Sequence, residues 1–337
     1  MNKKIIAAFQ YIFFLGLGIF LVWWSLHQIP DEKWPEFKKA LANAEYWLII
    51  PVFLILSASH LLRALRWRLL MQPMGYTPSI ANSFFAVMVG YLANLAVPRL
   101  GEVLKCTILA RYEKVPAENI VGTIVAERAF DVICLGVVFL LALFFQFDVV
   151  LQAYEHFKKI IATLPADNES GYGKYIFWAI LLLLVLTLIW MLFTGKWKIV
   201  QQKIIAIVKG VWAGLTSALK LKNKFLFILY TIAIWGLYIA GTWIGLKATT
   251  GTADMGIAQA ISGLAFASIG MILTPGGIGA YALLLAIVLE YNGVPNEIGL
   301  ANGNLQWLAQ CFIVLLVGFL SLLLLPWYNK KRMHEAN

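Results

Sequence analysis

Six long apolar segments constrain this chain more than any other feature of its sequence. A helix needs about 20 apolar residues to cross ~30 Å of hydrocarbon, and each segment has that length. The segments lie near residues 5–26, 47–68, 118–147, 174–194, 225–247 and 301–326. Composition agrees, because 61% of the 337 residues are hydrophobic and only 13% are charged. A soluble domain is about 25% charged. The sequence therefore predicts one all-α integral membrane domain over residues 1–337.

The remaining composition argues against several other classes of protein. Cys106, Cys134 and Cys311 lie in or beside apolar runs at no metal-like spacing, so we expect no metal site and no cofactor. The net charge of +10 sits in loops between apolar runs. That pattern is typical of the cytoplasmic side of a membrane protein and does not indicate a nucleic-acid partner. Without a nucleotide motif, we also expect no enzymatic activity.

The distribution of lysine and arginine predicts the orientation in the membrane. The loop at 195–224 contains seven lysines and no acid, and both chain ends are basic. The loops at 27–45 and 148–173 instead mix acids with lysines. Because cytoplasmic loops carry the excess of basic residues, we expect both termini in the cytoplasm and the protein in the cell (inner or plasma) membrane. Apolar positions between the lysines of 195–224 predict a basic amphipathic helix on the cytoplasmic surface.

Two further apolar segments, 79–113 and 257–292, are interrupted by proline and glycine. Each begins and ends on one side of the membrane, so each crosses an even number of times. The breaks lie at 97–101 and 274–279, and each return arm of about 11 residues reaches only ~17 Å. We expect two opposed re-entrant helical hairpins whose tips meet near the midplane. Two full helical pairs, for eight to ten spans in all, are the alternative. Paired breaks of this kind favour a transporter built as an inverted repeat.

Charged residues cluster at the first break and on the span that follows it. They are Arg99, Glu102 and Lys105 at the break, and Glu127, Arg128 and Asp131 on the span. Counted from Glu118, Glu127 lies ~13 Å and Asp131 ~19 Å along the helix. A charge at that depth costs at least ~2.5 kcal/mol and needs a partner. One interpretation is an anion site, in which Arg99 and the backbone amides near Gly101 hold a phosphate. The other is a closed ion-pair network that holds the hairpin to its neighbour.

The second break carries backbone amides and no charge. Its candidate site residues are Pro275, Gly276, Gly277 and Gly279. Irregular backbone at membrane depth is tolerated only beside protein or a wet cavity, so this break is either the second half of a substrate site or a simple bend. In the second case Gly263, Ala267 and Gly270 would allow close helix packing.

Four further residues are secondary candidates for the site: Arg63, Arg66, Asn94 and Gln306. We interpret Arg63 and Arg66 mainly as anchors that snorkel from the end of their span toward anionic headgroups. Gln306 belongs to a polar stripe with Asn302 and Gln310, which indicates interhelical hydrogen bonding more than a ligand surface.

Four motifs resemble the membrane region of the lysylphosphatidylglycerol synthase/flippase family in its stand-alone form. They are Arg63-Ala64-Leu65-Arg66-Trp67, Asn94-x-x-x-Pro98-Arg99-x-Gly101-Glu102, Glu127-Arg128-x-x-Asp131 and Pro275-Gly276-Gly277-Ile278-Gly279. The resemblance covers residues 5–325 and implies a lipid-translocating domain, which in the best-known members moves an aminoacylated phospholipid between leaflets. Those members add a soluble aminoacyl-transferase domain. This chain ends at Asn337 without one, so we expect no lipid aminoacylation.

The chain departs from the family pattern in two places. Lys105 stands where arginine is usual, which keeps the charge but loses the bidentate fork. Residues 280–282 lack the glutamate that often follows the glycines, so the resemblance does not imply recognition of a lysyl ammonium at this hairpin.

These features lead to one preferred function and two alternatives. We expect a flippase or transporter that moves an anionic or headgroup-modified lipid through a midplane cavity between the hairpins. The alternatives are an integral-membrane transferase acting on lipid-linked substrates, and a scaffold that binds a separately encoded lipid-modifying enzyme. The partners to consider are anionic membrane lipids, such an enzyme, and a second copy of the chain.

Overall fold

Helices are the only regular elements among the residues that the structure, a computed structural model, describes. Those residues are 16, 19–24, 26–27, 29–97, 100–163 and 221–335. The α-helices are α2 (Trp34–Ala42), α3 (Ile49–Met71), α4 (Ile80–Ala96), α5 (Leu100–Glu113), α6 (Ala117–Phe145), α7 (Phe147–Thr163), α10 (Lys224–Leu246), α11 (Ile257–Leu273), α12 (Ala280–Glu290) and α13 (Asn296–Glu335). Four 3-10 turns join them: η1 (Asp31–Lys33), η2 (Tyr46–Leu48), η3 (Gln72–Met74) and η4 (Pro275–Gly277). The predicted all-α fold is confirmed.

Four helical stretches in the described part of the chain are long and apolar enough to cross a membrane. They are Tyr46–Met74, Asn119–Phe145, Lys224–Leu246 and Asn296–Lys330. They match four of the six predicted spans, and the chain is a membrane protein. The predicted span at 174–194 lies outside the described residues, as do most of 5–26 and nearly all of the basic loop at 195–224.

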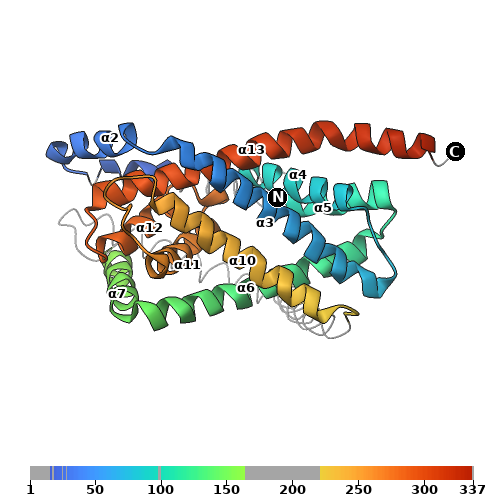
Figure 1. Ribbon diagram of the computed structural model, residues 1–337, viewed down its shortest axis with the longest axis horizontal. Helices are drawn as coiled ribbons and strands as arrows, with labels where there is room; N and C mark the ends of the chain where they lie inside the picture. Colours follow the sequence, from blue (N-terminus) through green and yellow to red (C-terminus); the bar gives the residue numbers. More distant parts are fainter. Residues whose placement is uncertain are drawn as a thin grey trace, which may run out of the picture.

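Helix α7 lies in the segment that the sequence predicted to be a connecting loop, residues 148–173 (Figure 1). Its buried residues Val150 and Ala153 pack with Val138 and Ala142 of α6 and with residues of α11 and α12. Its exposed side chains include Glu155 and Lys158, which form an ion pair, together with Leu151 and Tyr154. The segment is thus an amphipathic helix, and its predicted position outside the membrane stays a prediction.

Both interrupted segments form pairs of short helices packed side by side, α4 with α5 and α11 with α12. Close backbone approach allows this packing. A Cβ at Gly101 would lie 1.9 Å from the Gly90 carbonyl oxygen, and one at Gly270 would lie 2.7 Å from the Ala280 carbonyl carbon. In Figure 1 the first pair occupies one half of the molecule and the second pair the other. Their re-entrant course in a membrane stays a prediction.

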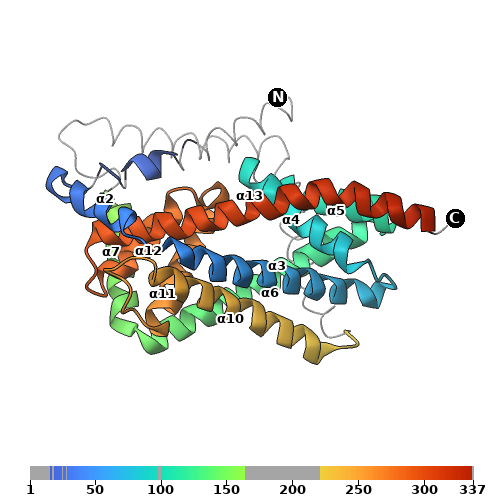
Figure 2. The same cartoon turned by 45° about the horizontal axis from the view of Figure 1, so that its top comes forward.

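Helices α3–α6 and α10–α13 have corresponding arrangements that run in opposite directions. Helix α3 packs along α10, and each hairpin's first arm packs against the long helix of the other half, α4 on α13 and α11 on α6. Figures 1 and 2 show α3 and α10 side by side, with their chain directions reversed. This is the arrangement that an inverted repeat predicts.

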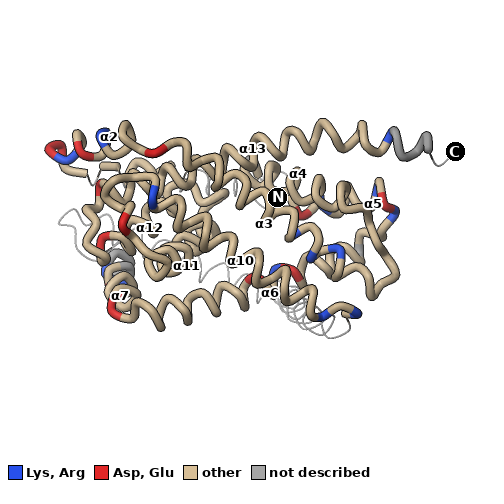
Figure 3. Tube along the Cα trace, in the orientation of Figure 1, with Lys and Arg blue, Asp and Glu red and all other residues tan. Residues whose placement is uncertain are grey.

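The connecting segments divide between the two ends of the molecule as the predicted orientation requires. Residues 72–79 and 113–117 lie at the same end as the C-terminus, and residues 29–46, 247–256 and 291–295 lie at the other (Figures 1 and 2). Charged residues gather mainly at these two ends, but a further group lies within the bundle on α3 and α6 (Figure 3). Which end faces the cytoplasm stays a prediction.

Candidate functional site

The tips of the two hairpins meet inside the protein. Helix α4 contacts η4, and a Cβ at Gly276 would lie 2.9 Å from Cδ2 of Leu95, near the end of α4. Thus two breaks about 180 residues apart in sequence, at 97–101 and 274–279, come together from opposite ends of the bundle (Figure 1). Pro98 and Arg99 lie outside the described residues, so the role of Arg99 stays a prediction.

Asn94 closes the first hairpin. Its side-chain Oδ1 accepts a hydrogen bond of 2.8 Å from the backbone N–H of Gly101. This bond satisfies one of the amides that a helix leaves open at its N-terminus. The Gly101 N–H is therefore bound within the protein, and the predicted binding of a phosphate by Arg99 and the other amides near Gly101 stays a prediction. Asn94 is a structural cap on α5.

Two arginines of α3 reach the acids of α6. The Arg63 guanidinium donates to Glu127 Oε1 at 2.9 Å and to Asp131 Oδ2 at 2.6 Å, and Arg66 donates to Asp131 Oδ1 at 2.7 Å. Arg66 and Glu127 are fully buried. The prediction that Arg63 and Arg66 snorkel to headgroups was therefore wrong. Arg63 and Arg66 are three residues apart and share one face of α3, and Glu127 and Asp131 are four apart and share one face of α6. This spacing was the sequence signal that could have suggested the pairing.

Lys105 adds a third buried cation from α5. Its Nζ lies 3.8 Å from Glu127 Oε2, and neither atom has a hydrogen-bond partner among the described residues. The ammonium instead stands over the rings of Trp67 and Tyr91, at 5.4 and 5.3 Å from their centroids. Aromatic faces stabilise a cation that has lost its water. Lys105 is thus held in place by rings and by one carboxylate.

The cluster ends in a looser, half-exposed pair between α5 and α6. Arg128 Nε lies 3.7 Å from Glu102, and its NH1 lies 3.8 Å from Asp131. The Arg128 and Glu102 side chains are 40% and 38% exposed. The described cluster contains the cations Arg63, Arg66, Lys105 and Arg128 and the acids Glu102, Glu127 and Asp131. With all seven ionised, the cluster has a net charge of +1.

Comparison with known proteins identifies the family of this chain. The family described as "Lysylphosphatidylglycerol synthase TM region" matches residues 11–318, which include the cluster and both hairpins. This chain belongs to that family. A UPF0104 membrane protein of Methanocaldococcus jannaschii is 26% identical over 96 residues, which cover 28% of this chain and 29% of that protein. No solved structure matches the chain.

In this member of the family, the second half carries amides where the first half carries charges. Gln306 donates to Asn302 Oδ1 at 2.7 Å, and Asn302 donates to the Gly245 carbonyl at 2.9 Å. The spacing shows the correspondence. Gln306 lies 26 residues after Ala280, as Glu127 lies 26 after Gly101. Gly245 lies 35 residues before Ala280, as Arg66 lies 35 before Gly101. Gln306 also accepts a hydrogen bond of 3.3 Å from the Tyr281 hydroxyl of α12, so both Asn302 and Gln306 form hydrogen bonds between helices.

The glycines of the second break have a structural reason to be glycine. Gly276, Gly277 and Gly279 have φ of 62°, 76° and 72°, which side chains disfavour. A Cβ at Gly277 would also lie 2.4 Å from Met271 Sδ. Trp307 Nε1 donates to the Gly276 carbonyl at 2.7 Å and so fixes the tip against α13. The close packing at Gly263 and Gly270 agrees with the interpretation of this break as a tight bend. A substrate site at the same break is compatible with such a bend.

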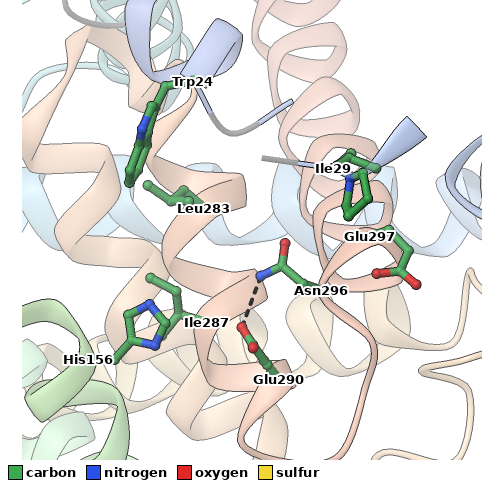
Figure 4. A pocket seen from close by; sticks show the side chains of 9 residues that line it. Trp24, Ile29, His156, Leu283, Ile287, Glu290, Asn296 and Glu297 are labelled. Carbon is green, nitrogen blue, oxygen red and sulfur yellow. Dashed lines mark hydrogen bonds between the residues drawn. The ribbon is translucent and has the colours of Figure 1, made fainter. Parts of the chain in front are cut away.

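A pocket that the sequence did not predict lies beside residues 29–30 and 296–297, at the end of the bundle away from the C-terminus, and Figure 4 shows its lining. It is lined by Trp24, Ile29, Pro30, His156, Leu283, Ile287, Glu290, Asn296 and Glu297. Its acids already have partners. Asn296 donates to Glu290 at 3.0 Å, and Lys33 lies 3.4 Å from Glu297. Hydrogen bonds to Glu36 and Glu297 raise the pKa of Lys33, so this pairing favours the charged amine. The pocket is separate from the hairpin tips.

Proposed function

We propose that this protein moves a lipid with an anionic or modified headgroup between the two leaflets of the cell membrane. The observation that carries the proposal is the meeting of two broken hairpins, entering from opposite ends, beside a buried cluster of net charge +1. Membership of a family described by a lysylphosphatidylglycerol synthase membrane region supports a lipid substrate. We further propose that both termini face the cytoplasm.

In this proposal the headgroup passes between the tips while the acyl chains stay in lipid. Non-helical backbone at membrane depth suits a path for polar groups, because it is tolerated only inside protein or beside water. An inverted repeat lets the two halves exchange conformations, so that access alternates between the sides. The excess positive charge would favour a phosphate over a neutral headgroup.

A reconstituted system tests this function directly. Purified protein is placed in liposomes that contain a fluorescent phosphatidylglycerol, and a quencher that cannot cross the bilayer is added outside. We expect the protected inner-leaflet fluorescence to decay faster than in protein-free liposomes, with no nucleotide and no partner protein present. Decay at the protein-free rate would argue against an autonomous flippase and in favour of the transferase or scaffold alternatives.

The contact between the hairpin tips gives a second prediction. In a cysteine-free background, Leu95→Cys with Ile278→Cys is expected to be joined by a short reducible cross-linker, because Leu95 lies against Gly276. If the tips must separate during transport, the cross-link stops lipid movement and reduction restores it. Each single variant treated with the same reagent is the control. Transport that continues at full rate in a fully cross-linked sample would contradict a path between the tips.

A further inference from the structure

The boundary between α5 and α6 differs from its counterpart in the other half. Its counterpart, α12 with α13, is closed by small residues. A Cβ at Gly303 would lie 2.7 Å from Ala282, and one at Gly299 would lie 3.1 Å from Ala286. Helix α6 also has two glycines, Gly122 and Gly136, but no atom of the described structure comes within 4 Å of a Cβ built on either. Gly122 and Gly136 thus face away from the described neighbouring helices, and α5 and α6 are in contact over a shorter stretch than α12 and α13.

Helices α5 and α6 expose apolar side chains around one arginine. On α6, Val121, Arg128 and Val132 are spaced by seven and four residues, which places them on one face. Val121 is 52% and Val132 67% exposed. On α5, Val103 follows Glu102 directly and is 59% exposed. The surface around the Arg128–Glu102 pair is thus apolar and uncovered.

With α6 spanning the membrane as proposed, this pair lies deep in the bilayer, and it is poorly satisfied. Arg128 is 11 residues from the start of α6, and Glu102 is 11 residues from the end of α5, so each lies ~16 Å from the same end of the bundle. The Arg128 Nε has no hydrogen-bond partner among the described residues and lies 3.7 Å from Glu102 Oε1, while the Arg128 NH1 lies 3.8 Å from Asp131 Oδ2. Half-exposed charges at such depth need a closer partner than this pair supplies.

We infer that the α5–α6 boundary is a lateral docking site for a phospholipid, whose phosphate binds the Arg128 guanidinium in place of the Glu102 carboxylate. The inference rests on the proposed function and adds the side from which the lipid enters. A guanidinium presents a planar fork of donors that matches phosphate oxygens. The acyl chains lie along Val103, Val121 and Val132, which are apolar and exposed. Behind Arg128, the buried part of the cluster supplies the excess positive charge.

Protection of cysteines from labelling tests the docking in detergent-purified protein. In a background with Cys106, Cys134 and Cys311 replaced by serine, Val103→Cys and Val132→Cys are treated with a maleimide. We expect added phosphatidylglycerol to slow labelling at both positions, while diacylglycerol, which has no phosphate, does not. Ile232→Cys on α10, where Ile232 is 65% exposed, is the control and should label at an unchanged rate. Equal slowing at Ile232→Cys, or slowing by diacylglycerol or inorganic phosphate alone, would overturn the inference.

Variants that change the charge of Arg128 or Glu102 provide a second test of the docking site. Arg128→Gln is expected to weaken protection by phosphatidylglycerol about tenfold, as the loss of one charge-assisted contact predicts. Arg128→Lys should retain part of it, and Glu102→Gln should strengthen it because the competing carboxylate is gone. Unchanged protection in Arg128→Gln would overturn the docking site.

If wild-type protein moves no lipid in liposomes, the flippase proposal fails. If wild type moves lipid and Arg128→Gln moves it equally fast, only the docking site fails.

Discussion

Glu127→Gln lowers the free energy of unfolding by ~3–5 kcal/mol, because it removes the carboxylate shared by three buried cations. Glu127 is fully buried, 2.9 Å from Arg63 and 3.8 Å from both Arg66 and Lys105. Glutamine keeps the shape but leaves the cations with one acid fewer. Equilibrium unfolding in detergent would measure the loss. Glu36→Gln, which breaks the exposed Lys33–Glu36 pair, is the matched control and should cause no measurable change.

A second variant shows that the loss has an electrostatic cause. Lys105→Met in the Glu127→Gln background removes one cation along with the acid, and its side chain remains long enough to fill the space between Trp67 and Tyr91. We expect the double variant to be more stable than Glu127→Gln alone, with a coupling that a double-mutant cycle quantifies. If Glu127→Gln destabilises no more than Glu36→Gln, the buried network contributes nothing to stability.

Gly101→Ala is expected to destabilise the protein by about 3 kcal/mol, the upper end of the cost of overpacking a core. Its Cβ would lie 1.9 Å from the Gly90 carbonyl oxygen and 2.6 Å from the carbonyl carbon, which are backbone atoms and cannot rotate away. Helices α4 and α5 would have to separate, which would also stretch the bond from Gly101 to Asn94. The same unfolding measurement applies, together with lipid movement in liposomes.

The control for this variant is Gly122→Ala on α6. Gly122 lies inside a helix, and no described atom is within 4 Å of the added methyl group. Alanine there should be neutral or slightly stabilising, since glycine is the poorer helix former. Equal losses for Gly101→Ala and Gly122→Ala would mean that the close contact of α4 with α5 is unimportant for the fold.

Features that depend on local composition were predictable from the sequence. Long apolar runs predicted the spans seen at Lys224–Leu246 and Asn119–Phe145, because hydrocarbon selects length and hydrophobicity alone. Proline and glycine predicted the breaks that precede α5 and α12, because these residues interrupt a helix wherever it packs. The corresponding breaks also suggested the inverted arrangement that the helix contacts show.

Partner choice across helices depended on the tertiary structure. The sequence placed Glu127 and Asp131 on one face of a membrane-spanning helix, but it could not reveal that Arg63 and Arg66 face them. That pairing depends on how α3 and α6 are rotated about their axes, and helical periodicity leaves this rotation open. The bond from Gly101 to Asn94 and the contact of Gly276 with Leu95 have the same origin, because each requires two segments to approach within side-chain distance.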